Sequence, residues 1–257
     1  MSETGTSEIL RLDAVSRRFS GLQALAEVSL VVGRGEVLGL IGPNGAGKTT
    51  LINTICGVTP ANSGRIVFAG QDITRIKTYR VARLGLSRTF QIVQPFAEFT
   101  ALDNVAAAAL FSQPGASLAF AREAAMEHLD FVGLAAQASQ RAATLTLAMR
   151  KRLELAKALA MKPKLLFLDE VNAGLNSAEV ERATALIHQL AASGITIVMI
   201  EHLMKVVLNV CTRIAVLHNG ELIADGAPHD VIDNPAVVEA YLGQQYAKKH
   251  AKPGARR

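Results

Sequence analysis

The sequence predicts an α/β fold built around a parallel sheet, and three observations lead to that prediction. Short apolar runs rich in β-branched residues alternate with helical segments through the second half of the chain, a pattern typical of parallel strands joined by crossover helices. Near the N-terminus a strand leads into a glycine-rich loop and then into a helix. A helical region without a convincing strand lies between the two. With 257 residues, 50% of them hydrophobic, the chain can bury a substantial core.

The N-terminal region is predicted to be rich in β-structure. Residues 28–32 and 37–41 are short, apolar and β-branched, and residues 33–35 favour a turn between them. After Gly47 the apolar residues are spaced for one buried face of a helix, which is expected to end at Gly57.

The middle of the chain is predicted to be helical. Residues 101–142 are alanine-rich with helical periodicity, and turn-forming residues interrupt the pattern at 113–115 and 132–133. We therefore expect a helical subdomain over about residues 92–160.

The second half is predicted to continue the parallel sheet. The predicted strands span residues 165–168, 195–200 and 213–217, and the predicted helices span residues 178–192 and 203–210. Asn219-Gly220 favours a tight hairpin turn before a last strand at residues 221–224.

The charge distribution does not favour a nucleic-acid surface. The formal net charge is +5, but the basic residues before the C-terminal tail are scattered and do not alternate with aromatic residues. Much of the excess lies near the C-terminus, where we expect residues 244–257 to form a basic, flexible tail. Charge alone does not decide the kind of partner, and no nucleic-acid partner is expected.

Cysteine content and hydropathy favour a cytosolic location. Cys56 and Cys211 each lie in an apolar stretch, so we expect two core thiols in a reducing compartment and no disulfide framework. The N-terminus lacks the features of a secretory signal, and no apolar run reaches the roughly 18 residues that span a bilayer. A membrane role is therefore expected to depend on a partner.

A phosphate-binding loop is the strongest motif of the chain. The segment is Gly42-Pro43-Asn44-Gly45-Ala46-Gly47-Lys48-Thr49, which fits two glycines separated by four residues and followed by lysine and a hydroxyl residue. The glycines let the backbone curl so that amide N–H groups and the positive end of the next helix face the phosphates. Lys48 is expected to neutralise the β- and γ-phosphates of a nucleotide and Thr49 to coordinate Mg²⁺, while Thr50 adds a nucleotide contact.

Two carboxylates follow the predicted strand 165–168. The end of a strand beside a phosphate loop is where the Mg²⁺ of a nucleotide is held, so Asp169 is the predicted metal ligand. Glu170 is then expected to face the γ-phosphate and to orient or deprotonate the attacking water.

With these motifs the chain resembles the nucleotide-binding subunit of ATP-binding-cassette (ABC) transporters from about Leu10 to Leu242. The resemblance implies the phosphate-loop NTPase fold of ABC ATPases, with a RecA-like core, an N-terminal antiparallel β subdomain and the helical signature subdomain. It also implies one ATP-binding domain over residues 8–243, with ATP and Mg²⁺ as cofactors and ATP hydrolysis as the activity.

The resemblance assigns three further site residues. Phe19 matches the aromatic residue that stacks on adenine. Gln91 matches the glutamine that contacts Mg²⁺ and water and begins the surface facing the membrane subunits. His202 matches the switch histidine that donates a hydrogen bond to the γ-phosphate, and none of the six histidines forms a zinc-ligand spacing.

The signature of the family is altered in this chain. Its usual core, Ser-Gly-Gly-Gln, stands as Thr146-Leu147-Ala148-Met149. In the family this loop closes over the nucleotide of the opposite subunit, so Thr146 and Ala148 are the expected nucleotide contacts of this chain with its partner. Thr146 keeps a hydroxyl, whereas Leu147 and Met149 replace residues suited to close approach and polar contact.

Other segments resemble the ATPases of branched-chain amino-acid importers: residues 169–176, residues 200–202 and residues 220–226. The resemblance implies import of branched-chain amino acids or of a related small solute such as urea or amides. It further implies permease subunits, a second ATPase subunit in a heterodimer or a homodimer, and an extracytoplasmic solute-binding protein acting indirectly. The chain would lie at the cytoplasmic face of the inner membrane, held there by the permease.

Two other functions stay open. The first is a soluble ABC ATPase acting on nucleic acid or ribosomes, but such relatives usually carry two cassettes or a long coiled coil, and this chain has room for one cassette and no heptad run. The second is a mainly regulatory nucleotide-binding partner, which the altered signature suggests.

Overall fold

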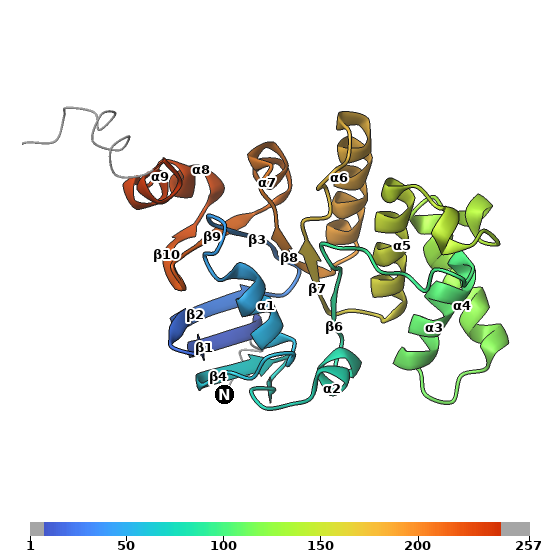
Figure 1. Ribbon diagram of the computed structural model, residues 1–257, viewed down its shortest axis with the longest axis horizontal. Helices are drawn as coiled ribbons and strands as arrows, with labels where there is room; N and C mark the ends of the chain where they lie inside the picture. The colour runs from blue at the N-terminus through green and yellow to red at the C-terminus, as the bar shows by residue number, and fades with distance from the viewer. Residues whose placement is uncertain (1–7, 243–257) are drawn as a thin grey trace, which may run out of the picture.

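A computed structural model describes residues 8–242, and two sheets organise this part of the chain (Figure 1). The predicted α/β class is confirmed. The predicted tail at residues 244–257 lies outside the described residues.

The first sheet is antiparallel and has the strand order β2-β1-β4-β5. Its strands are β1 Glu8–Phe19, β2 Leu22–Gly33, β4 Ser63–Phe68 and β5 Gln71–Asp72. The sequence pattern predicts only a short piece of β2 and misses β1. The reason is that β1 and β2 pair through several bulges and have residues of positive φ inside them, such as Ala14 (φ 47°) and Glu27 (φ 51°), so the alternation of apolar and polar residues is broken.

The second sheet has the order β10-β9-β3-β8-β7-β6. Its strands are β3 Val37–Ile41, β6 Leu86–Arg88, β7 Leu165–Asp169, β8 Thr196–Ile200, β9 Arg213–His218 and β10 Glu221–Gly226. All neighbours are parallel except β9 and β10. The predicted strands at 165–168, 195–200 and 213–217 are confirmed with shifts of one residue.

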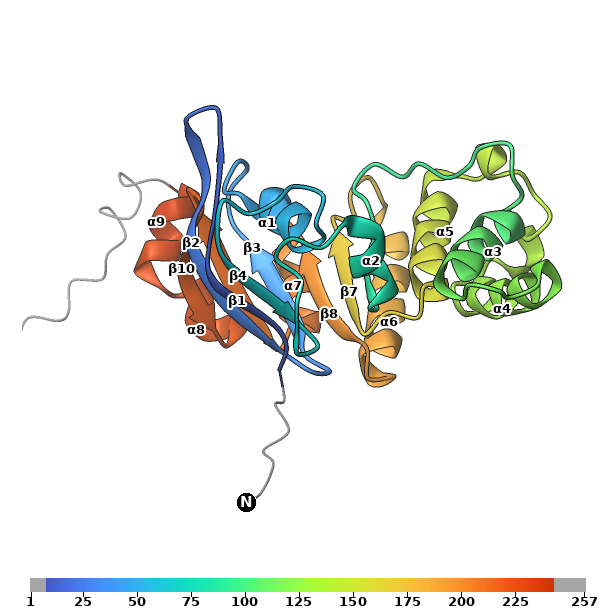
Figure 2. The same cartoon turned by 90° about the horizontal axis from the view of Figure 1, so that it is seen from below.

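Helices cover the sheets and extend the molecule at one end. They are α1 Lys48–Ile55, α2 Thr78–Arg83, α3 Ala101–Ser112, α4 Leu118–Phe131, α5 Leu147–Ala160, α6 Ser177–Ala192, α7 Met204–Val210, α8 Pro228–Ile232 and α9 Pro235–Leu242, with 3-10 turns η1 Ala135–Gln137 and η2 Ala142–Thr144. In both views α3, α4 and α5 lie together at the end opposite the antiparallel sheet (Figures 1 and 2). The domain bounds 8–243 and about 92–160 stay predictions.

The six-stranded sheet separates two hydrophobic cores. Alternate residues of each parallel strand face opposite cores: Leu166 and Leu168 belong to the core that includes residues of α3 to α7, whereas Leu165 and Phe167 pack with α1 and the antiparallel sheet. Burial on both faces explains why these strands are continuous apolar runs.

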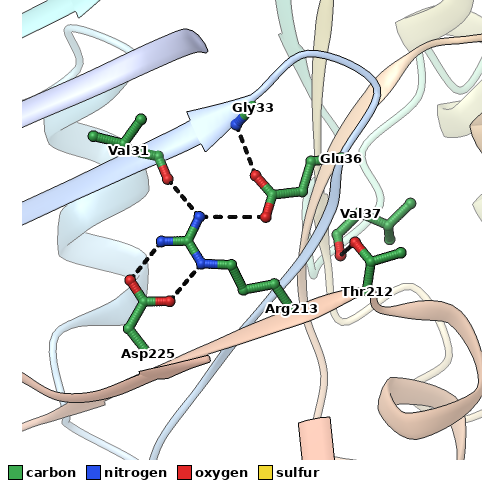
Figure 3. Close-up of polar contacts among 7 residues, drawn as sticks. All are labelled: Val31, Gly33, Glu36, Val37, Thr212, Arg213 and Asp225. Atoms are coloured by element: carbon green, nitrogen blue, oxygen red, sulfur yellow. Dashed lines mark hydrogen bonds and ion pairs between the residues drawn. The ribbon is translucent and has the colours of Figure 1, made fainter. Parts of the chain in front are cut away.

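Arg213 joins the two sheets at the start of β9 (Figure 3). Its Nε and Nη2 atoms donate to the two carboxylate oxygens of Asp225 at 2.6 and 2.5 Å. Its Nη1 atom donates to the carbonyl of Val31 in β2 at 2.9 Å and lies 3.3 Å from Glu36 Oε1. One guanidinium therefore connects β2, β9, β10 and the segment before β3.

Candidate active site

The phosphate loop joins β3 to α1, and two of its glycines are required by their surroundings. Gly42 has φ 150° and Gly47 has φ 106°. A Cβ atom on Gly42 would lie 2.0 Å from the carbonyl oxygen of Leu217, and one on Gly47 would lie 2.6 Å from that of Ala24. The loop can therefore pack this closely against β9 and β2 only with glycine at both positions.

The turn between β9 and β10 holds the loop in place. Asn219 (φ 49°) and Gly220 (φ 82°) form the predicted two-residue hairpin turn. The Gly220 N–H donates to the Ala46 carbonyl at 2.9 Å, and the Gly220 carbonyl accepts from the Ala26 N–H at 2.9 Å. This turn therefore links the phosphate loop to β2.

Lys48 folds back over the loop that precedes it. Its Nζ atom donates to the carbonyl oxygens of Gly42 at 2.7 Å and Pro43 at 2.9 Å. Burial lowers the pKa of Lys48, while the charges of Glu170 and Asp169 raise it. Because α1 begins at Lys48, the free N–H groups of its first turn lie beside this ammonium group, and together they can bind a phosphate.

Asp169 ends β7 and is buried at 3% exposure. Burial raises its pKa, and the neighbouring Arg88 guanidinium lowers it. Arg88 Nη2 lies 3.2 Å from Asp169 Oδ2, and Arg88 Nη1 donates to Asn53 Oδ1 of α1 at 2.6 Å. The backbone N–H of Asp169 donates to Thr89 Oγ1 at 3.1 Å. The carboxylate is therefore oriented by residues at the end of β6.

Arg88 has no part in the sequence prediction. Arg88 ends the strand β6, which pairs in parallel with β7. This pairing places Arg88 opposite Phe167, two residues before Asp169. No motif singles out an arginine at that position, so the pairing of β6 with β7 had to be known first.

Two predicted site residues, Gln91 and His202, contact the Glu170 carboxylate from the loops that follow separate strands. Gln91 Nε2 donates to Glu170 Oε2 at 2.6 Å, and His202 Nε2 lies 2.7 Å from Glu170 Oε1. Since an ionised carboxylate only accepts, the proton of this contact belongs to His202 Nε2. The loops after β6, β7 and β8 therefore bring three of the four predicted catalytic residues together, and the fourth, Lys48, lies in the same cleft as Gln91 and Glu170.

A cleft of about 720 Å³ lies over the phosphate loop. Its lining includes the following residues: Phe19, Asn44, Gly45, Ala46, Gly47, Lys48, Thr49, Thr50, Gln91 and Glu170. The Phe19 ring is 42% exposed, and the Arg17 guanidinium lies 4.5 Å from its centroid. The cleft therefore joins an accessible aromatic ring, a phosphate site and a carboxylate.

The oxygen donors beside this cleft fit Mg²⁺. The Thr49 hydroxyl, the Gln91 amide and the Asp169 carboxylate line one adjoining cavity, and a carboxylate, neutral oxygens and substrate phosphates form the usual ligand set of this ion. Among residues 8–242 no cluster of three His, Cys, Asp or Glu side chains is arranged to hold a metal. A magnesium ion here would therefore need phosphate oxygens and water as further ligands.

Thr146 and Ala148 do not reach this cleft. They line a separate cavity of about 230 Å³ between α5 and α6. Thr146 caps α5, because its Oγ1 atom accepts from the Met149 N–H at 3.3 Å, and Leu147 is 48% exposed. Their predicted contact is with the nucleotide of an opposite subunit, and it stays a prediction.

Comparisons with known proteins identify relatives of the whole cassette. The model of the family described as ABC transporter matches residues 25–173, and that described as branched-chain amino acid ATP-binding cassette transporter matches residues 221–247. The high-affinity branched-chain amino acid transport ATP-binding protein BraF of Pseudomonas aeruginosa is 38% identical, over 92% of this chain and 98% of its own. The corresponding LivG protein of Escherichia coli is 36% identical over the same shares.

Solved structures agree with these relatives and confirm the predicted ABC ATPase fold. A nucleotide-free ATP-binding cassette from an ABC transporter superposes with a TM-score of 0.83 at 34% identity, covering 92% of this chain and 100% of that one. The ADP conformation of the cassette MJ1267 gives a TM-score of 0.82 at 34% identity, and the match covers 93% of this chain and 100% of that one.

Proposed function

The chain belongs to the ABC transporter family, and we propose that it couples ATP hydrolysis to import of a branched-chain amino acid or a related small solute such as urea or an amide. It is an ATP-binding subunit with ATPase activity, as the family match and the relatives show. The observation that carries the proposal is the position of Glu170 between Gln91 and His202, beside the phosphate loop.

The phosphate loop binds the nucleotide in this proposal. Its amide groups and Lys48 neutralise the β- and γ-phosphates, while Phe19 stacks on the adenine. Thr49, Gln91 and Asp169 hold Mg²⁺, which when bound neutralises charge on the phosphate oxygens.

Glu170 is the general base in this proposal. Its carboxylate orients the attacking water and accepts a proton from it, and His202 Nε2–H turns from Glu170 to the γ-phosphate when nucleotide binds. The short contacts of Glu170 with Gln91 and His202 support these roles, because they keep the carboxylate at the mouth of the cleft.

Its role as an ATP-binding subunit of a transporter implies membrane-embedded permease partners. Within residues 8–242, every helix falls short of the length or apolarity that crossing a bilayer requires. The permease is proposed to dock beside Gln91, where Phe90, Ile92 and Phe96 are 53%, 72% and 56% exposed.

We further propose a heterodimer with a second ATPase and indirect coupling to a solute-binding protein. The chain is proposed to lie at the cytoplasmic face of the membrane.

Purification of the complete transporter tests this function. Recovery of permease subunits with the tagged chain, followed by ATP-dependent uptake in vesicles, is the expected result. Competition among labelled leucine, urea and a short amide identifies the cargo class. Recovery with ribosomes or DNA, and no permease, contradicts the proposal.

A mainly regulatory role is the second candidate, because the signature at the start of α5 is altered and its Leu147, which replaces a residue suited to close approach, is 48% exposed. Steady-state ATPase activity with and without the partner ATPase distinguishes the two functions. Activity that depends on Glu170 of this chain supports the motor, whereas activity that depends only on the partner's glutamate supports regulation.

A further inference from the structure

The backbone of Glu170 is fixed as firmly as its carboxylate. The residue has φ 48°, a left-handed conformation that costs a non-glycine residue free energy and needs support from its surroundings. Its N–H donates to the Ile200 carbonyl at 3.0 Å. Its carbonyl oxygen accepts from Lys151 Nζ at 2.9 Å and from the Ala173 N–H at 3.1 Å. Two neighbouring elements therefore support this strained turn, β8 and the helix α5.

A buried carboxylate lies on the same network. Glu201 is 3% exposed, and its Oε1 atom accepts from the N–H of Asn172 at 3.1 Å and from Asn172 Nδ2 at 2.8 Å. Burial raises the pKa of this carboxyl. Hydrogen bonds from Asn172 and from the backbone amides of His202 and Leu203 lower the pKa by less. Glu201 therefore ties the turn after Glu170 to the segment that carries His202.

Lys151 supplies the positive charge of the network. Its pKa is lowered by burial and raised by the carboxylates of Glu201 and Glu170. The Nζ atom supports the Glu170 carbonyl directly, whereas Glu201 is hydrogen-bonded by Asn172 and affects Lys151 only as a neighbouring charge. Lys151 lies five residues after Thr146, which caps the same helix. The start of α5 is therefore mechanically linked to Glu170.

We propose that Lys151 is a positioning residue through which α5 sets the orientation of Glu170. The inference rests on the proposed role of Glu170 in hydrolysis. Of the two donors to the Glu170 carbonyl, Lys151 Nζ is the one that a shift of α5 moves, and the carboxylate on the same residue moves with the carbonyl. Because misplacement by about 1 Å can cost roughly 100-fold in rate, such a link can make hydrolysis depend on the position of α5.

A graded series of variants at Lys151 tests this proposal in the purified transporter complex. Lys151→Arg keeps charge and donors, Lys151→Gln keeps a donor alone, and Lys151→Met removes both. We expect kcat for ATP hydrolysis close to wild type for the arginine variant and about 10- to 100-fold lower for the methionine variant, with the glutamine variant between them. The KM for ATP and the affinity for ATP should change less than about threefold in all of them. Lys205→Gln, an exposed lysine on α7, is the matched control and should match wild type.

A double-mutant cycle separates positioning from a general loss of structure. Since Lys151 acts through Glu170, Lys151→Met should lower single-turnover hydrolysis less than about twofold when Glu170→Gln is already present. Equal losses in both backgrounds, or a fall in ATP affinity that parallels the fall in kcat, would overturn the proposal. If the wild-type complex does not hydrolyse ATP, the proposed function itself fails; if it does and the methionine variant has the same kcat, only this inference fails.

Discussion

At the scale of single residues, the proposed hydrolysis depends on Glu170. Its carboxylate accepts hydrogen bonds from Gln91 and His202 and faces the cleft over the phosphate loop. Glu170→Gln keeps the size of the side chain and removes the base. We expect hydrolysis to slow by roughly 10²- to 10⁴-fold while ATP binding is retained. Single-turnover hydrolysis and equilibrium ATP binding check the two halves of this prediction, and wild-type rates in the variant would contradict the assigned role.

The two cysteines provide a test of the packing around α1 and α7. Burial raises the pKa values of Cys56 and Cys211 to about 12 each, so at pH 8 both thiols are almost fully protonated as well as shielded. We expect the native protein to react with neither thiol on the time scale of minutes and the denatured protein to react with both. A rapid reaction of one thiol in the native protein would contradict the burial of that residue.

The sequence identifies the residues of the site better than their mutual contacts. Gln91, Glu170 and His202 can be found because each follows a predicted strand and matches a family motif. Arg88 and Lys151 could not be found that way, because each contacts a residue on another element: Arg88 the carboxylate of Asp169, and Lys151 the carbonyl of Glu170. A side chain that binds a distant backbone atom leaves no local pattern.

At the scale of elements, the phosphate loop requires glycine for steric reasons. Gly47→Ala places a Cβ atom 2.6 Å from the Ala24 carbonyl oxygen at a φ of 106°. We expect a loss of about 1 to 3 kcal/mol in unfolding free energy, seen in a denaturant titration, and a loss of ATP binding because the loop is displaced. Gly70→Ala is the matched control, since its φ is 80° but its Cβ would meet nothing within 4 Å. The account is contradicted if the two variants are equally stable and bind ATP equally well.

Arg213 connects the two sheets, and its substitution is a second test at the scale of elements. Arg213→Ala removes the paired contact with Asp225 and the contacts with Val31 and Glu36 (Figure 3). We expect about 1 to 3 kcal/mol of destabilisation, which for a protein of this size lowers Tm by several degrees. Arg65→Ala breaks only an exposed pair with Asp72 and should change Tm by less than about 2 °C. Equal Tm values for the two variants would show that the contacts of Arg213 do not stabilise the fold.

Element by element, the parallel strands were predictable and the N-terminal hairpin was less so. Strands β3, β7, β8 and β9 are buried on both faces, so their sequences are continuous apolar runs with few alternatives. The hairpin of β1 and β2 carries bulges and charged residues, and its pairing depends on contacts far along the chain, such as β1 with β4. Local patterns cannot encode such pairing.

At the scale of the whole molecule, the order of strands creates the active site. The sequence predicts parallel strands but does not predict that β3, β8, β7 and β6 are neighbours. That order puts the phosphate loop and the loops carrying Gln91, Glu170 and His202 at one edge, where the carboxyl ends of parallel strands meet. The start of α5 faces a different cavity, and the contact of Thr146 and Ala148 with the nucleotide of an opposite subunit stays a prediction.

Binding of Mg-ATP to the purified chain, measured by titration calorimetry with and without its companion subunits, tests the central claim most directly. The amides of the phosphate loop, Lys48 and Thr49 are expected to bind Mg-ATP in roughly the micromolar to millimolar range, and Lys48→Ala should weaken binding by at least about tenfold because a charge-assisted contact with the phosphates is lost. Absence of binding to the wild-type chain at millimolar Mg-ATP under both conditions would contradict the account.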